Sequence, residues 1–310
     1  MHTDIDAAVH AWRTDGFVVL PAYLFSTDLA AATAELPLLF PTADQFHDRV
    51  NPERNRRFED EFGGIEDFPF TSTPLSLLAV HPLLIELAQQ LLGTSELRVY
   101  SIEAWAKYSG AADYDQHLHR DYLGATLLVP SDDLRFGQVE MFVYLVDVPV
   151  ELGPTAYVAS SHTSALPLIP NWFPPVDGKT DSDHPTWISP LGRPDLYEHE
   201  VRAPGTAGTV VAYTNQTVHR GTQLTAPRGA RYTLHLNFRP AESEWQSRHS
   251  WVEHAIEQPW SNFVEAASPS QLALFGWPSP GHPFWTRRTI DAIHQRYPRL
   301  DVTPWATSLE

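Results

Sequence analysis

The alternation of hydrophobic and polar positions predicts a chain that is helical at its start. Ile5, Val9 and Trp12 share one face of a helix that stops before Gly16, and the apolar run FVVLP follows as a short strand. Residues 41–80 are charged and show no regular period.

Two further helices are predicted in this first part of the chain. One runs from about residue 28 to residue 36, and the other covers HPLLIELAQQLLG, with Pro82 at its start and Gly93 just past its end. Nothing in the first 96 residues suggests a chemical function.

From about Leu97 the period changes to that of β-strands. Six segments are rich in Val, Tyr, Thr, Leu and Phe and are separated by turn residues: LRVYSIEAWAKYS, GATLLVP, QVEMFVYLVDV, TAYVA, GTVVAYT and ARYTLHLNF. Several alternate polar and apolar side chains, as the strands of an antiparallel sandwich do. We therefore predict a mainly β protein with a double-stranded β-helix (jelly-roll, cupin-like) core and flanking N- and C-terminal helices.

The expected organisation is a single domain over residues 1–310. Its parts are a mainly helical segment (1–96), the jelly-roll core (97–240) and a helical appendage (241–310) whose last helix runs from about Thr286 to Tyr297. Within the core, residues 163–200 are rich in proline and lack a helix or strand period. A loop of that length inside a compact domain is typical either of a functional lid or of a disordered segment.

Charge and composition exclude several classes of function. With 21 basic and 38 acidic residues, the net charge of −17 disfavours nucleic acid and anionic membrane surfaces as partners. The chain has no cysteine, so a metal must be held by histidine, carboxylate or water. The start of the chain lacks a signal-peptide pattern, and no stretch approaches the ~20 apolar residues of a membrane span, so we expect a cytoplasmic protein that acts on a small molecule. Nothing in the sequence bears on its oligomeric state.

A candidate metal site lies in QHLHRDYLG. His119 and Asp121 are two residues apart, so in an extended segment they point to the same face. A non-haem Fe(II) site needs two imidazoles and one carboxylate. His219, after the strand GTVVAY and two residues before Gly221, is the candidate for the second imidazole.

The strand after His219 opens with two arginines, Arg228 and Arg231. The planar guanidinium can pair with a carboxylate through two hydrogen bonds. An Fe(II) enzyme that uses 2-oxoglutarate needs such a group for the carboxylate that does not bind the iron.

The combination H-x-D, H-x-G about a hundred residues later, and then an arginine resembles the phytanoyl-CoA dioxygenase (PhyH-like) family of Fe(II)- and 2-oxoglutarate-dependent oxygenases. DVPVELGPTAYVASSH is similar to a family segment through Gly153, Ser161 and His162, although Ala159 and Ser160 replace its Pro-Gly. DGFVVLPAYL resembles the family's opening strand. The resemblance runs from about residue 10 to 240.

The resemblance implies roles for individual residues. His119, Asp121 and His219 would bind Fe(II), and Arg231, in preference to Arg228, would bind 2-oxoglutarate, with O2 as the second co-substrate. Tyr144 falls where the family places an aromatic residue near the co-substrate. Lys107, on the strand before the metal motif, is a candidate partner for either carboxylate of 2-oxoglutarate, and a solvent-facing lysine is the alternative.

The resemblance also implies the type of reaction. 2-Oxoglutarate would be decarboxylated to succinate and CO2, giving an oxidant for a C–H bond of a small organic metabolite or natural-product intermediate. Related halogenases carry a small residue in place of the carboxylate. The presence of Asp121 therefore predicts hydroxylation or another oxidation and not halogenation.

Two other functions compete with the oxygenase. His117, His119 and Asp121 form an H-x-H-x-D pattern, as in metallo-β-lactamase-like hydrolases, but those sequences continue with a histidine where Tyr122 stands here. The second alternative is a non-catalytic jelly-roll binding protein, which would not require an arginine at its offset from His219. In the oxygenase, His117 shares a face with His119 but would support the metal ligands, face the substrate or simply pack, and would not bind the metal.

Aromatic residues of the insertion are the candidates for a substrate lid. Trp172, Phe173 and Trp187 would form its apolar walls. His162 and His235 are expected to be structural, the first at a turn and the second in the middle of a strand.

Overall fold

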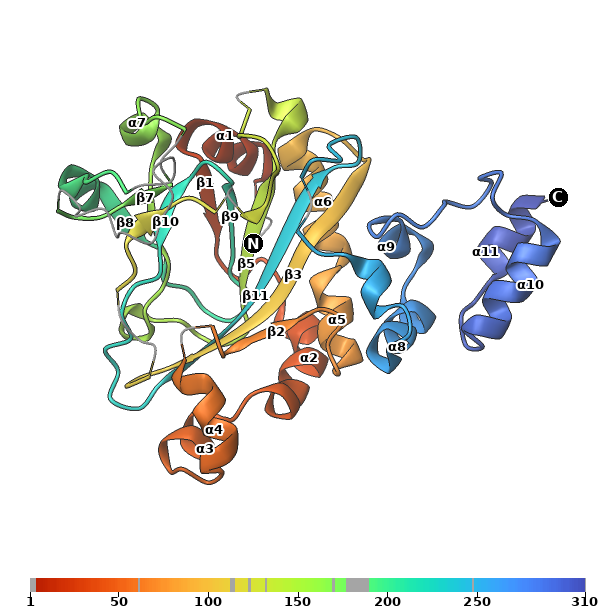
Figure 1. The fold of residues 1–310 in the computed structure, drawn as a ribbon, viewed down its shortest axis with the longest axis horizontal. Helices are drawn as coiled ribbons and strands as arrows, with labels where there is room; N and C mark the ends of the chain where they lie inside the picture. Colours follow the sequence, from red (N-terminus) through yellow and green to blue (C-terminus); the bar gives the residue numbers. More distant parts are fainter. Residues whose placement is uncertain are drawn as a thin grey trace.

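The computed structural model describes residues 4–60, 62–111, 115–121, 124–131, 133–168, 171–176, 190–246 and 248–309. Two antiparallel sheets form its centre (Figure 1). The six-stranded sheet has the order β1-β9-β5-β11-β3-β2, and the five-stranded sheet has the order β7-β4-β10-β6-β8. The strands are β1 (Phe17–Leu20), β2 (Ile65–Asp67), β3 (Leu97–Tyr108), β4 (Leu118–His119), β5 (Val139–Tyr144), β6 (Ala156–Val158), β7 (Trp172–Phe173), β8 (Glu200–Arg202), β9 (Val210–Thr214), β10 (Val218–Arg220) and β11 (Ala230–Pro240).

The long central strands of the six-stranded sheet separate two kinds of side chain. β3 and β11 pair along their whole length, with one register shift at Asn237/Phe238. Because successive side chains of a strand point to opposite faces, one face of β11 carries Leu234 and Leu236 into the main core, and the other carries polar residues toward the second sheet. The alternation of the sequence therefore creates a dry face and a polar face on the same sheet.

Helices cover the dry face. Among those that precede the core, α5 and α6 lie against the central strands (Figure 1). α1 and α6 end at Gly16 and Gly93, as predicted from the sequence, and both glycines adopt the left-handed conformation. The helices of the first part are α1 (Ile5–Asp15), α2 (Ser26–Leu39), α3 (Ala43–His47), α4 (Pro52–Arg56), α5 (Thr73–Ala79) and α6 (Pro82–Leu92), and the short α7 (Ser160–Thr163) follows β6.

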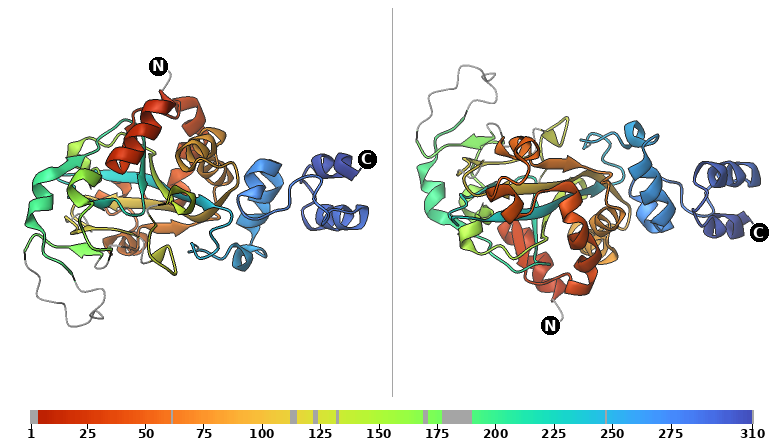
Figure 2. Two further views of the ribbon diagram at one scale, coloured as in Figure 1. Left: turned by 90° about the horizontal axis from the view of Figure 1, so that it is seen from above. Right: turned by 90° about the horizontal axis from the view of Figure 1, so that it is seen from below.

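The last part of the chain forms an appendage at one end of the molecule (Figure 2). Its outer helices pack through Trp277, Trp285 and Trp305. α10 confirms the predicted last helix, with Thr286 as its N-cap. The helices are α8 (Gln258–Ala266), α9 (Pro269–Ala273), α10 (Arg287–Arg296) and α11 (Thr303–Ala306).

The structure corrects parts of the predicted secondary structure. The described structure is 37% helix and 20% strand, so the term mainly β suits the core and not the whole molecule. Residues 41–80 contain α3, α4, β2 and α5 instead of irregular structure, and the described part of 163–200 contains β7 and a 3-10 helix, Pro194–His199. GATLLVP is not a strand, because Leu127 and Leu128 are 85% and 60% exposed and pair with neither sheet.

Within the described residues, the stretch Thr73–Leu92 has the length and hydropathy of a membrane-spanning helix. The expectation that no stretch of the sequence has the length and apolar composition of a membrane span is therefore wrong. In the structure the stretch is divided into α5 and α6, and 56% of its most apolar window is buried. Its hydropathy reflects packing inside the protein.

Candidate metal centre and active-site cavity

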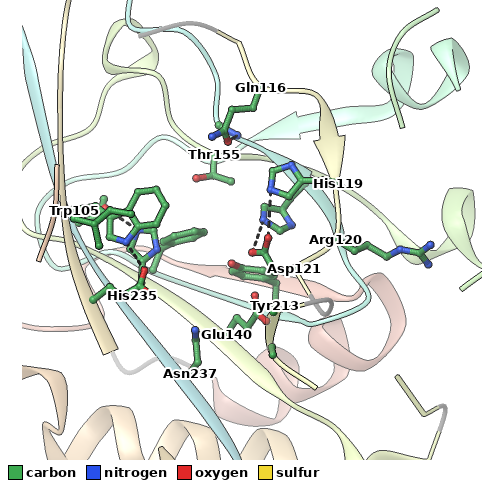
Figure 3. A pocket seen from close by; sticks show the side chains of 18 of the residues that line it. Trp105, Gln116, His119, Arg120, Asp121, Glu140, Thr155, Tyr213, His235 and Asn237 are labelled. Carbon is green, nitrogen blue, oxygen red and sulfur yellow. Dashed lines mark hydrogen bonds and ion pairs between the residues drawn. The ribbon is translucent and has the colours of Figure 1, made fainter. Parts of the chain in front are cut away.

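A cavity of about 760 Å³ lies between the polar face of the six-stranded sheet and the five-stranded sheet. This volume is in the range of small-molecule sites. Figure 3 shows side chains from both sheets pointing into it. The two sheets therefore contribute different groups to one site.

The predicted ligand set His119, Asp121 and His219 is assembled at this cavity (Figure 3). His119 on β4 lies directly opposite His219 on β10, and Asp121 follows β4. The Nε2 atoms of His119 and His219 lie 3.4 and 3.1 Å from the two carboxylate oxygens of Asp121. The three ligand atoms lie within 4.8 Å of one another, which suits a single metal ion.

Backbone hydrogen bonds orient both imidazoles. The Nδ1 of His119 is 2.8 Å from the carbonyl oxygen of His117, and the Nδ1 of His219 is 3.0 Å from that of Thr217. Since a carbonyl oxygen only accepts, each Nδ1 carries a proton, and each Nε2 faces Asp121. A protonated Nε2 donates to the carboxylate, whereas in the neutral ring with its proton on Nδ1 the Nε2 lone pair is available to a metal ion. This is the tautomer that a metal-binding histidine needs.

The electrostatics of the cluster favour a charged carboxylate. Burial opposes ionisation of Asp121, but the charge of His219 and hydrogen bonds from His119 and His219 outweigh it and hold the pKa of Asp121 well below its usual range. A divalent cation at the same place would favour the charged carboxylate in the same way.

The segment after His219 is held by close contacts. Gly221 and Gln116 exchange two hydrogen bonds, and a Cβ atom at Gly221 would lie 2.8 Å from the Gln116 side-chain oxygen. Arg220 points to the other face of β10 and pairs with Glu200 and Asp115. The H-x-G pattern therefore has a local reason, because the glycine lets the chain bearing His119 approach the chain bearing His219.

Two cations line another part of the cavity. Arg231 on β11 lies opposite Lys107 on β3, and both are buried. Burial lowers the pKa of Arg231, and its Nη1 meets no hydrogen-bond acceptor among the described residues. A buried, incompletely paired guanidinium is costly, and a carboxylate ligand would offset that cost. Arg228 is instead exposed and pairs with Asp44 and Asp48.

The family model for phytanoyl-CoA dioxygenase (PhyH) matches residues 12–231, which is most of the chain. The chain belongs to this family. The match confirms the resemblance seen in the sequence and spans the metal cluster and Arg231. No curated protein matches the chain.

Solved structures related to this PhyH-family chain share its fold. The epimerase SnoN, in complex with Fe3+, alpha ketoglutarate and nogalamycin RO, is 20% identical, with a TM-score of 0.53 over 82% of this chain and 90% of SnoN. The carbocyclase SnoK from nogalamycin biosynthesis is 22% identical, with a TM-score of 0.50 over 78% of this chain and 87% of SnoK. At these identities the likeness concerns the fold.

The other residues singled out in this PhyH-family sequence lie in different environments. Trp172 lines the cavity and stacks on His119 with the ring centroids 4.6 Å apart, whereas Phe173 points away and is fully buried. Tyr144 is buried but does not line the cavity, and its hydroxyl donates to the carbonyl of Ala203 at 2.7 Å. Trp187 lies outside the described residues.

Three further histidines are separated from the metal cluster. His117 lines the cavity, yet its side chain is not part of the ligand group. His162 lies on α7 and stacks on His199. His235 lines the cavity, stacks on Trp105 and interacts with the Thr233 hydroxyl. It therefore packs within the sheet, as expected for a structural residue, and also forms part of the cavity wall.

The sequence analysis missed the acidic part of the cavity. Glu103 on β3 and Glu140 on β5 are buried and line it, together with Asn237 on β11. Burial and the charge of Asp121 raise the pKa of Glu140 to about 8. The sequence contains features that indicate these two acids. Glu140 interrupts the apolar run of QVEMFVY, and Glu103 is an even number of residues from Lys107, so both point to the same face of their strand.

Proposed function

We propose that this protein is an Fe(II)- and 2-oxoglutarate-dependent oxygenase that oxidises a C–H bond of a small organic molecule. The observation that carries the proposal is the pairing, in one cavity, of a His-Asp-His cluster with the buried, incompletely paired Arg231. Membership of the PhyH family supports it. The fold shared with SnoN, whose structure contains Fe3+ and alpha ketoglutarate, agrees with it.

Different residues of the cavity would bind the iron and the 2-oxoglutarate. The Nε2 atoms of His119 and His219 and the carboxylate of Asp121 would hold the iron. Arg231 would bind a carboxylate of 2-oxoglutarate, with the positive charge of Lys107 beside it. When bound, Fe(II) supplies the oxidising chemistry with O2 and 2-oxoglutarate, releasing succinate and CO2.

The remaining cavity walls would position the substrate. Trp172 stands next to the ligand His119 and, with Trp105 across the cavity, offers apolar surface to a carbon skeleton. Holding a C–H bond close to the metal centre is the contribution that the protein makes to selectivity. We infer hydroxylation or a related oxidation and not halogenation, since Asp121 takes the carboxylate place in the cluster.

The decisive experiment is an anaerobic titration of the protein with Fe(II) and then 2-oxoglutarate, followed by visible absorption. A weak charge-transfer band that requires both additions is expected in the unmodified protein. Arg231→Ala should weaken 2-oxoglutarate binding by tenfold or more, of the order expected for a lost charge-assisted hydrogen bond. The matched control Arg228→Ala removes an exposed arginine of the same strand region and should leave the band unchanged.

The competing hydrolase makes the opposite prediction. If the unmodified protein gives no band, binds zinc tightly and hydrolyses test esters or lactams, the oxygenase proposal is overturned. Such a result would also bring His117, which lines the same cavity, into the metal site.

A further inference from the structure

The cavity-facing side chains of the six-stranded sheet are ordered by charge. Pairing in register places Lys107 beside Arg231 on one row of the sheet. Six residues further along β11, Asn237 stands between Ser101 and Glu140, and Glu140 is paired in turn with Tyr213. The polar face therefore runs from a cationic row to an acidic row.

Glu140 is the central group of the acidic row. It is only 2% exposed, lines the cavity, and accepts a hydrogen bond of 2.9 Å from the Tyr100 hydroxyl. The Tyr213 hydroxyl also interacts with it. Within the described part of the chain, no lysine, arginine or histidine forms an ion pair with Glu140.

The other buried acid of the cavity differs in this respect. Glu103 forms an ion pair of 3.0 Å with Arg248 and accepts a hydrogen bond of 2.8 Å from the Trp105 indole. Its charge therefore has a partner within the protein. Glu140 has phenol hydroxyls instead of an ion-pair partner. Burial and the charge of Asp121 raise its pKa to about 8, and a cation beside it would lower that pKa and stabilise the carboxylate.

We infer that Glu140 binds a positively charged amine of the substrate. The inference rests on the proposed function, because it assigns the substrate class of the same cavity. A buried carboxylate is stabilised when a cation enters beside it, and an ammonium group is the cation that an organic substrate can bring. The side-chain amide of Asn237 lies beside Glu140 in Figure 3 and can accept a hydrogen bond from the same group.

The rest of the molecule agrees with this ligand. Trp105 and Trp172 present aromatic surface to the carbon skeleton, and aromatic rings also attract cations. The net charge of −17 favours the approach of a cation. A 2-oxoglutarate dianion at the Lys107–Arg231 row and an ammonium at the Glu140 row would then occupy separate parts of one cavity.

The test compares amines with alcohols of the same skeleton. Protein loaded with Ni(II) and 2-oxoglutarate is titrated with matched pairs, cyclohexylamine against cyclohexanol and glucosamine against glucose, and binding is measured by calorimetry. The amine of each pair should bind roughly tenfold more tightly than the alcohol, as expected for one charge-assisted hydrogen bond. Equal binding within the pairs, or preference for the alcohols, overturns the inference without any variant.

Variants locate the effect at Glu140. Glu140→Gln keeps the shape and removes the charge, so the preference for amines should disappear, whereas Glu140→Asp keeps the charge and should retain it. Glu53→Gln removes one exposed negative charge on α4 and controls for the general field. An amine preference that survives Glu140→Gln assigns the site elsewhere and overturns the inference.

The two proposals fail in different ways. If the Fe(II) and 2-oxoglutarate band does not form in the unmodified protein, the proposed function itself is wrong. If the band forms and the matched pairs bind equally, the oxygenase stands and only the assignment of an amine substrate is lost.

Discussion

At the residue scale, the two candidate metal-binding histidines are held in the same way. Each imidazole donates its Nδ1 proton to the carbonyl of the residue two positions earlier in its own strand segment. Because β4 and β10 are antiparallel neighbours, these two hydrogen bonds turn both Nε2 atoms toward Asp121. The metal site therefore depends on local backbone geometry more than on distant side chains.

This geometry predicts opposite effects for the two ends of the HLHRD motif. Asp121→Ala should abolish tight Fe(II) binding, since it removes the carboxylate that faces both imidazoles. His117→Ala should keep it, because His117 contributes its backbone carbonyl to the site and not its ring. Calorimetric titration with Fe(II) under nitrogen measures both. Loss of binding in His117→Ala would revive the hydrolase pattern.

Gly221 offers a second prediction at this scale. Gly221→Ala would place a methyl group 2.8 Å from the Gln116 side-chain oxygen and displace its hydrogen bond to the Gly221 amide. The expected cost is about 1 kcal/mol of unfolding free energy, measured by denaturant titration. Gly124→Ala is the matched control, because a Cβ atom there has nothing within 4 Å. Equal stability of the two variants would show that the close approach is unimportant.

Candidate site residues could be predicted from the sequence where their spacing along the chain indicated a shared function. His119 and Asp121 share a face because they are two apart, and the offset of Arg231 from His219 matched a known pattern. The acidic row could not be predicted, because Glu140 and Asn237 become neighbours only through the register of β5 with β11. Register between distant strands is a property of the folded sheet.

At the element scale, β7 shows how two adjacent aromatic residues take separate roles. Trp172 and Phe173 point to opposite faces, so one stacks on His119 at the cavity and the other enters a buried cluster and packs under Arg120. The expectation that both form the wall of a lid is therefore corrected for Phe173.

The two positions should separate binding from stability. Trp172 is 37% exposed. Its replacement by alanine should raise the KM for the substrate, and should change the rate of succinate formation in the absence of substrate by a smaller factor. Phe173→Ala should instead lower the unfolding free energy by about 3–5 kcal/mol, the usual cost of deleting a buried phenylalanine. Oxygen consumption and thermal unfolding give the two readouts. A large loss of substrate-free turnover in Trp172→Ala would place its main role at the metal centre.

The long strands were predictable and the short ones were not. LRVYSIEAWAKYS and ARYTLHLNF alternate over ten or so residues and form β3 and β11. β4 and β10 span two and three residues, too few to show a period, although they hold the candidate metal-binding histidines. Conversely, GATLLVP has strand composition but exposes its leucines, because composition alone does not supply a partner strand.

At the scale of the whole molecule, the proposed cofactors would tie the two sheets together. The candidate metal ligands come from the five-stranded sheet and the segment after β4, whereas Arg231 and Lys107 come from the six-stranded sheet. A metal ion without 2-oxoglutarate would connect only β4, the segment after it and β10, all on the side of the five-stranded sheet. 2-Oxoglutarate bound to that ion would extend the connection to β3 and β11.

This arrangement predicts stepwise stabilisation. A divalent ion such as Ni(II) at a hundred times its Kd should add about 2.7 kcal/mol to the unfolding free energy, and a chelator should reverse it. 2-Oxoglutarate should raise Tm further, and more in metal-loaded protein than in metal-free protein, since it would bind the ion as well as Arg231. Scanning calorimetry of the four combinations measures this coupling.

Two variants assign the steps to the two sheets. Asp121→Ala should lose the metal step and most of the co-substrate step, because it acts on the ion. Arg231→Ala should keep the metal step and lose the second, because its guanidinium lies on the opposite sheet. If 2-oxoglutarate stabilised metal-free and metal-loaded protein equally, it would bind away from the cluster. The two sheets would then be held together by their packing alone, and the cationic row would serve another ligand.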